Sequence, residues 1–178
     1  EAVASAILAV VAPGDEVVLF SPAYDAYAPM VRRAGGVPVF VPLRPPHWQY
    51  DRTVIEAAIS PRARAIIVND PLNPTGTVAS ADELAMLAQI CIGHDLIAIC
   101  DEVWENVRFD DCAHRSLLAL PGMADRAIKI GSAGKIFGAT GWKVGWLIAA
   151  PAMAAVRIAV AIRSEERRVG KECRSRWS

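Results

Sequence analysis

A lysine among small residues has the clearest chemical potential in this sequence. Lys135 lies in the segment 130–143, IGSAGKIFGATGWK, between the apolar runs 127–130 and 144–150. Small residues let a large ligand approach the backbone closely. In such a cramped, partly dry place an amine loses hydration and can attack a carbonyl. The segment predicts that Lys135 forms an imine with an aldehyde cofactor; the alternative is a surface lysine in a glycine-rich loop.

A carboxylate and an amide follow two other apolar runs. Asp101 comes directly after the run 96–100 and could hold a protonated pyridine nitrogen, which would make the ring an electron sink. Asn73 lies in the turn-dense segment NDPLNPTG and could direct its amide at a phenolic oxygen. Each has an ordinary alternative, because an Asp at a strand end is often solvated and Asn is a common turn residue.

Three further side chains could bind the rest of such a cofactor. Tyr24, two residues after Pro22, could stack on an aromatic ring, although it could equally be a core or surface aromatic. Ser132 and Lys143 can both reach a phosphate, one through its hydroxyl and one through a charge-assisted contact. The combination of these groups is more informative than any one of them.

Short apolar runs that alternate with segments of helical spacing must position these residues. The runs predicted as strands are 16–20, 37–41, 65–68, 96–100, 127–130 and 144–148. The predicted helices are 1–11, 24–34, 51–59, 80–94 and 151–162, with Asp51 as an N-cap and a capping box at Ser80–Glu83.

This order of elements predicts an α/β fold. Strands that are apolar throughout and alternate with helices favour a three-layer α/β/α arrangement with a mainly parallel sheet. Ligands in such sheets bind at the carboxyl ends of the strands. The residues that follow those ends are Tyr24, Asn73, Asp101, Ser132 and Lys135, so we expect them to share one edge of the sheet.

Composition restricts the possible functions. The 178-residue chain is 53% hydrophobic with zero net charge, which gives no reason to expect nucleic-acid or membrane partners. No apolar run reaches the ~18 residues of a membrane span, and the first residues do not resemble a signal peptide. Cys91, Cys100, Cys112 and Cys173 show no paired spacing, which favours free thiols in the cytoplasm. The three histidines are isolated in sequence, so no metal site is predicted.

The last sixteen residues do not fit this pattern. Residues 163–178, RSEERRVGKECRSRWS, change abruptly to a highly charged composition. A basic nucleic-acid-binding arm is one interpretation. We favour another: the peptide resembles the translation of a DNA-sequencing adapter, and we exclude it from the fold. The predicted organisation is a partial cofactor-binding domain over 1–162 and a non-native, disordered or artefactual tail over 163–178.

Four motifs together resemble a known family. They are PGDEVVLFSPAYDAY, NDPLNPTG, DEVWENVRFD and GSAGKIFGATGWKVGW, which span most of residues 1–160. In combination they are similar to class I/II aminotransferases of the fold-type I pyridoxal-phosphate superfamily, especially the kynurenine/glutamine and aspartate branch. The resemblance implies the large domain of a pyridoxal 5'-phosphate enzyme that acts on amino acids and 2-oxo acids and is usually a homodimer.

The resemblance also implies roles for individual residues. Lys135 is the expected catalytic residue, which bonds to the cofactor aldehyde and moves the proton between the substrate Cα and the cofactor. Asp101 is the expected partner of the pyridine nitrogen, Tyr24 stacks on the ring and Asn73 binds its phenolic oxygen. Ser132 and Lys143 are the expected phosphate ligands. Cis peptide bonds are expected before Pro22 and Pro74.

Three departures from the family pattern affect these expectations. Trp104 stands where the family usually has tyrosine; we expect it to line the cofactor pocket, where an indole can donate a hydrogen bond but cannot ionise. Lys143 stands where many relatives have arginine. The other departure is a loss, because a phosphate loop, the first strand, an N-terminal arm and the small domain with its carboxylate-binding arginine have no counterpart. We therefore expect this chain by itself to be nearly inactive.

The expected reaction of the intact protein is transamination between an amino acid and a 2-oxo acid. Two alternatives remain open. A pyridoxal-phosphate-dependent C–S β-lyase would use the same lysine and aspartate. A non-catalytic aminotransferase-like sensor domain of a transcription regulator would need a DNA-binding module upstream.

Overall fold

A six-stranded sheet forms the centre of the molecule. The computed structural model describes residues 1–109 and 112–153, and its strand order is β2-β1-β3-β4-β5-β6. All neighbouring strands are parallel except β6, which is antiparallel to β5. The bounds are β1 Glu16–Ser21, β2 Val37–Pro42, β3 Ala63–Asn69, β4 Ile97–Asp101, β5 Ala127–Ser132 and β6 Gly145–Ile148. The predicted α/β fold with a mainly parallel sheet is confirmed.

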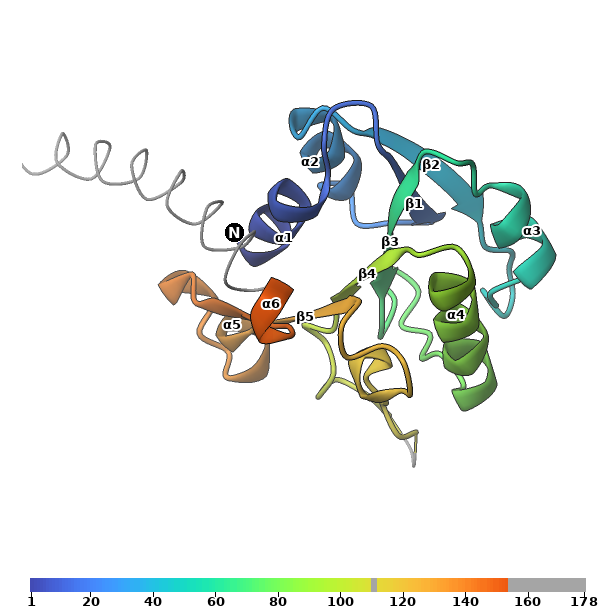
Figure 1. The fold of residues 1–178 in the computed structure, drawn as a ribbon. Helices are drawn as coiled ribbons and strands as arrows, with labels where there is room; N and C mark the ends of the chain where they lie inside the picture. The colour runs from blue at the N-terminus through green and yellow to red at the C-terminus, as the bar shows by residue number, and fades with distance from the viewer. Residues whose placement is uncertain (110–111, 154–178) are drawn as a thin grey trace, which may run out of the picture.

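Helices cover both faces of the sheet (Figure 1). Their bounds are α1 Ala2–Val10, α2 Tyr27–Arg33, α3 Arg52–Ala57, α4 Ala81–Gly93, α5 Ala133–Ile136 and α6 Pro151–Met153, with 3₁₀ turns η1 Leu117–Ala119 and η2 Thr140–Trp142. Asp51 caps α3 by accepting from two backbone amides, and Ser80 forms the predicted capping box with Glu83.

Alternation along the strands divides the core into two layers. In β1, Val18 and Phe20 pack on the side of α3 and α4, whereas Val17 and Leu19 pack against α1 and α2. Successive side chains of a strand point to opposite faces, so a continuous apolar run is needed where both faces are buried. These layers fix the strand ends that carry the candidate site.

The structure differs from the expected helices in two places. The second helix begins at Tyr27 and not at Tyr24, because residues 24–27 first form a turn closed by a hydrogen bond from the Tyr27 amide to the Tyr24 carbonyl. Residues 133–136, for which no helix was predicted, form the short helix α5. The small residues there show no helical spacing from which this turn could have been predicted. The predicted helix beyond residue 153 and the 163–178 segment lie outside the described residues.

The structure also shows the peptide bonds before proline, the state of the cysteines and the lengths of the helices. The Ser21–Pro22 and Asn73–Pro74 bonds are cis, as expected, and so are Pro45–Pro46 and Asp70–Pro71. The described cysteines are unpaired thiols, with Cys91 and Cys100 buried and Cys112 exposed. None of the helices in the described ranges is long and apolar enough to cross a membrane.

Candidate active site

One large cavity opens at the carboxyl ends of the parallel strands. Its volume is about 1140 Å³. Every side chain proposed from the sequence as a cofactor ligand lines it: Tyr24, Asn73, Asp101, Trp104, Ser132, Lys135 and Lys143. The chain thus brings together residues from four strand ends and the connections that follow them.

Asp101 supplies the buried charge of this cavity. It is the last residue of β4 and only 5% exposed. Burial raises the pKa of its carboxyl group, while hydrogen bonds from Tyr27 and the Val103 amide and the charge of Lys135 oppose that rise. One carboxylate oxygen accepts from the Tyr27 hydroxyl at 2.6 Å; the other has only a long 3.4 Å contact with the Val103 amide. That second oxygen could still accept from a ligand.

Tyr27 and Asn69 belong to the site although neither was predicted. Tyr27, the first residue of α2, is 3% exposed, and burial together with the neighbouring Asp101 raises its phenol pKa, so it remains a donor. Asn69, at the end of β3, donates from its side-chain amide to the Asp101 carbonyl at 2.8 Å and accepts from the Asn73 amide at 2.8 Å. These bonds join the loop of Asn73 to the strand of Asp101. The sequence signals were the position of Asn69 after an apolar run and the place of both residues within the motifs that resemble the family.

The side chains of Lys135 and Trp104 are in contact and both line the cavity. The Lys135 ammonium lies 4.4 Å from the centroid of the Trp104 ring, which is within cation–π range. Lys135 itself is exposed, so the expectation of a cramped, partly dry lysine is wrong for this structure. The reason is geometric: α5 places the lysine at the rim of a cavity much larger than its own side chain.

The residues expected to bind phosphate lie near a helix start. Ser132 ends β5 and Lys143, with φ 56°, follows η2; both line the cavity. The first turn of α1, including Ala2 and Ser5, lines it as well. Amide groups at a helix N-terminus attract anions. The sequence did not reveal this contribution, because residues 1–11 were predicted as a helix with no role in binding.

Close packing between β5 and β6 shapes one wall. A side-chain carbon placed on Gly131 would come within 2.3 Å of the Trp146 indole, and one on Gly145 within 3.1 Å of the Gly131 carbonyl. Both glycines and Trp146 line the cavity. The glycines therefore let the indole lie directly against the neighbouring strand.

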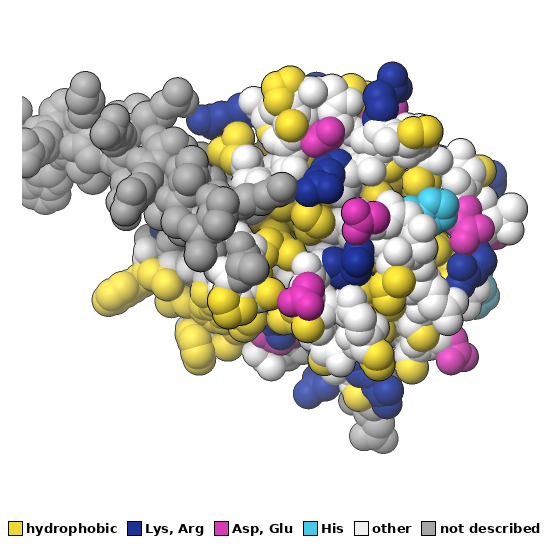
Figure 2. Space-filling view, in the orientation of Figure 1, with side chains coloured by type: hydrophobic (Ala, Val, Ile, Leu, Met, Phe, Trp, Pro, Cys, Tyr) yellow, Lys and Arg dark blue, Asp and Glu magenta, His cyan; other side chains and the backbone are white. Residues whose placement is uncertain are grey.

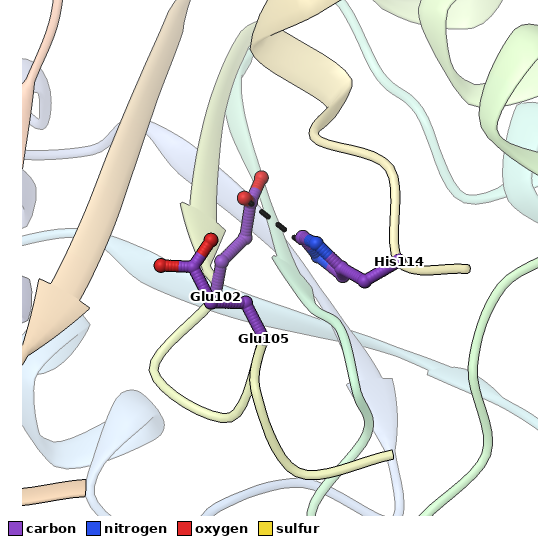
Figure 3. Close-up of side chains that lie close together, drawn as sticks. All are labelled: Glu102, Glu105 and His114. Carbon is purple, nitrogen blue, oxygen red and sulfur yellow. Dashed lines mark ion pairs between the residues drawn. The ribbon is translucent and has the colours of Figure 1, made fainter. Parts of the chain in front are cut away.

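A second charged cluster lies behind the strand ends. Glu102, Glu105 and His114 each offer a ligand atom within 4.8 Å of the others (Figure 3). His114 is isolated in the sequence, and only the loop that returns it to the sheet brings it close to the two glutamates. The Lys129 ammonium, however, already pairs with Glu105 at 2.5 Å and Glu102 at 3.1 Å. We therefore do not assign a metal to these residues.

The fold and the cavity define an aminotransferase domain. A family model for aminotransferase class I and II matches residues 1–167. The chain belongs to this family.

Similar proteins include a probable N-succinyldiaminopimelate aminotransferase, DapC, of Mycobacterium tuberculosis, 48% identical over 148 residues that cover 82% of this chain and 37% of that protein. Human kynurenine–oxoglutarate transaminase 1 is 43% identical, over 81% of this chain and 37% of its own. The solved structure of aspartate aminotransferase from Thermus thermophilus with maleate matches with a TM-score of 0.86 and 32% identity, over 92% of this chain and 42% of that one. This chain spans less than half the length of these relatives.

Proposed function

We propose that this chain is the cofactor-binding part of a pyridoxal-phosphate-dependent aminotransferase, which moves an amino group between an amino acid and a 2-oxo acid. The observation that carries the proposal is that Lys135 and Asp101 line the same cavity, where burial raises the pKa of the Asp101 carboxyl group and the Lys135 charge opposes that rise. Membership of the aminotransferase family supports it independently. We propose that the partial cofactor-binding domain covers residues 1–162 and that residues 163–178 are a non-native tail.

The residues present suit pyridoxal phosphate. A buried carboxylate with one weakly used oxygen favours a cationic N–H donor, and a protonated pyridine nitrogen is one. Tyr24, 45% exposed and edge-on to Tyr27, can offer its face to a ring. We assign the phenolic oxygen to Asn73, which hydrogen bonds through Asn69 hold beside Asp101.

The phosphate and the pocket wall are assigned to the remaining residues. Ser132 and Lys143 would hold the phosphate by hydroxyl and charge, together with the first turn of α1. Trp104 would line the pocket beside Lys135, where its indole can donate a hydrogen bond but cannot ionise.

When bound, pyridoxal phosphate supplies the aldehyde for lysine and substrate amines and a ring that accepts electrons. The side chains of the chain have separate tasks around it. The Lys135 amine would take the proton from the substrate α-carbon and donate it two atoms away, at the carbon that carried the aldehyde oxygen. Asp101 keeps a proton on the ring nitrogen, with Tyr27 holding its carboxylate in place.

Replacement of Lys135 by alanine in the complete protein tests this proposal. Loss of single-turnover transamination by at least about a thousandfold would support Lys135 as the general base. An ordinary single-turnover rate in the Lys135→Ala protein would contradict the role. Pyruvate release from cystathionine by the wild-type protein, without keto-acid exchange, would instead indicate a β-lyase.

We also propose that the intact protein is a cytoplasmic homodimer. Cys91 and Cys100 are buried thiols, which suit a reducing cytoplasm. Phe137 and Trp142 are 75% and 82% exposed, and hydrophobic side chains gather over the α5–β6 region in Figure 2. Such a surface suits contact with a second copy in a homodimer. Sedimentation of the complete protein would distinguish a dimer from a monomer.

A further inference from the structure

Two buried carboxylates directly follow the residues that form the floor of the cavity. Asn69 and Asp101 are paired in register at the ends of β3 and β4. The next residues, Asp70 and Glu102, are 3% and 2% exposed. The Asp70 amide donates to the Asp101 carbonyl at 3.2 Å, so the two strand ends are joined through their backbones as well. Any group that fixes these carboxylates also fixes the cavity floor.

His114 stands between the two carboxylates. Its Nε2 atom lies 3.4 Å from Asp70 Oδ2 and 3.7 Å from Glu102 Oε2, and its side chain is 6% exposed. Figure 3 shows the imidazole directed at Glu102. Among the described residues, these three atoms are buried without a hydrogen-bond partner. Buried polar atoms are costly unless they are satisfied. Glu102 Oε2 has the Lys129 ammonium at 3.1 Å, so the approach of His114 Nε2 matters most for Asp70 Oδ2.

The same cluster holds the turn that carries Trp104. Glu102 accepts from Ser116 at 2.8 Å, and Glu105 accepts from Lys129 at 2.5 Å. The Glu105 amide donates to the Glu102 carbonyl at 3.0 Å, which closes the turn between them. Trp104 projects from this turn toward the Lys135 ammonium. The turn is therefore held from behind while its indole lines the cavity.

The proton affinities of Asp70 and His114 suit a shared proton. Burial raises the pKa of the Asp70 carboxyl group to about 6, and burial lowers the pKa of the His114 imidazole. The two groups therefore compete for a proton much more evenly than they would in water. Other charges around them are Glu83 on α4, Glu105 in the turn and Lys129 on β5.

We propose that His114 is a positioning residue, whose imidazole clasps Asp70 to Glu102 and so holds Asp101 and the Trp104 turn in place for the cofactor. The clasp contains one hydrogen that lies between His114 Nε2 and Asp70 Oδ2. The inference rests on the proposed function, since the positions of Asp101 and Trp104 have this meaning only if the cavity binds pyridoxal phosphate. His114 itself touches neither cofactor nor substrate.

The test compares His114→Leu and His114→Gln in the complete protein, with exposed His47→Leu as the matched control. Affinity for pyridoxal phosphate is measured by absorbance titration at a temperature where all proteins are folded. Leucine removes the imidazole from Asp70 Oδ2, whereas Glu102 keeps Lys129 and Ser116. We therefore expect affinity to fall about tenfold and the absorption band of the bound cofactor to shift. Glutamine can still donate toward Asp70, so its affinity stays within about threefold of wild type. His47→Leu matches wild type.

Equal affinity and an unchanged absorption band in His114→Leu would overturn the inference. If the leucine protein does not fold, the Asp70→Asn variant tests the inference instead. Its side-chain amide can still hydrogen-bond to His114 but carries no titratable proton. We expect its cofactor affinity to depend less on pH between about 5 and about 7 than that of wild type; an identical pH profile would overturn the inference.

Cofactor binding by the wild-type protein tests the proposed function, and the comparison with the His114→Leu variant tests the role of His114. A wild-type protein that does not bind pyridoxal phosphate overturns the proposed function. A wild-type protein that binds it, together with a leucine variant that binds it equally well, overturns the clasp alone. Affinity that rises on addition of Zn²⁺ and falls with a chelator would also count against the clasp, because it would mean that a metal binds where Lys129 lies.

Discussion

The hydroxyl of Tyr27 donates a 2.6 Å hydrogen bond to the carboxylate of Asp101, and both residues are buried beside the cavity. The bond joins the start of α2 to the end of β4. It favours the ionised carboxylate, against the effect of burial on its pKa. Tyr27, a residue for which the sequence predicted no role, thus influences the charge that the proposed cofactor ring would meet.

Replacement of Tyr27 by phenylalanine should therefore raise the pKa of Asp101 further. A hydrogen bond to a charged group contributes about 1.5–3 kcal/mol, so we expect affinity for pyridoxal phosphate to fall by roughly tenfold to a hundredfold. Absorbance titration of the complete protein measures this. Tyr50→Phe is the control, because Tyr50 packs on Phe20 away from the cavity. Equal losses in both variants would argue against a specific role for Tyr27.

The elements of the sheet were predictable because the strands are continuous apolar runs between helices with capping residues. The Tyr27–Asp101 hydrogen bond could not be predicted, because the two residues are 74 positions apart and no sequence pattern links them. Lys135, Asp101 and Asn73 were found because each follows an apolar run. His114 gave no such signal, because only the return of its loop brings it to Asp70 and Glu102.

Removal of the Trp104 ring should make Lys135 more reactive. The cation–π contact stabilises the ammonium by about 1 kcal/mol, and the indole also shields it. We expect Trp104→Leu to increase acetylation of Lys135 about fivefold, with a smaller change in Trp104→Phe. Mass spectrometry of the cofactor-free protein measures the rate. The control is Trp142→Leu, since that indole is 82% exposed; the same increase there would contradict a specific contact.

Gly131→Ala should destabilise the protein. The added carbon would lie 2.3 Å from the Trp146 indole, so the ring or the β5–β6 pairing must move. We expect a loss of about 1–3 kcal/mol in the free energy of unfolding. The matched change Gly93→Ala, where no atom lies within 4 Å, should be neutral or slightly stabilising at the end of α4. Chemical denaturation of both variants measures this, and an unaffected Gly131→Ala would refute the packing argument.

The buried Asp70 should reduce stability as pH rises. Its pKa is about 6 when folded against 3.8 for the ordinary group, so between those values the folded protein binds more protons than the unfolded chain, and its stability falls with increasing pH. Asp70→Asn removes this contribution. His114, with a lowered pKa, contributes in the opposite direction in both proteins. We expect the melting temperature of Asp70→Asn relative to wild type to increase by roughly 2–6 °C from pH 4.5 to pH 6.5. A constant difference would contradict the raised pKa.

The most direct measurement concerns the position of the amine that bonds to the cofactor. The sequence contains four lysines: Lys129, Lys135, Lys143 and Lys171. The complete protein is incubated with pyridoxal phosphate, reduced with borohydride to make any lysine–aldehyde bond permanent, digested and mapped by mass spectrometry. We predict the added mass at Lys135, at about one cofactor per chain. Labelling of Lys143 or another lysine in its place, or no stable labelling, would contradict the central claim.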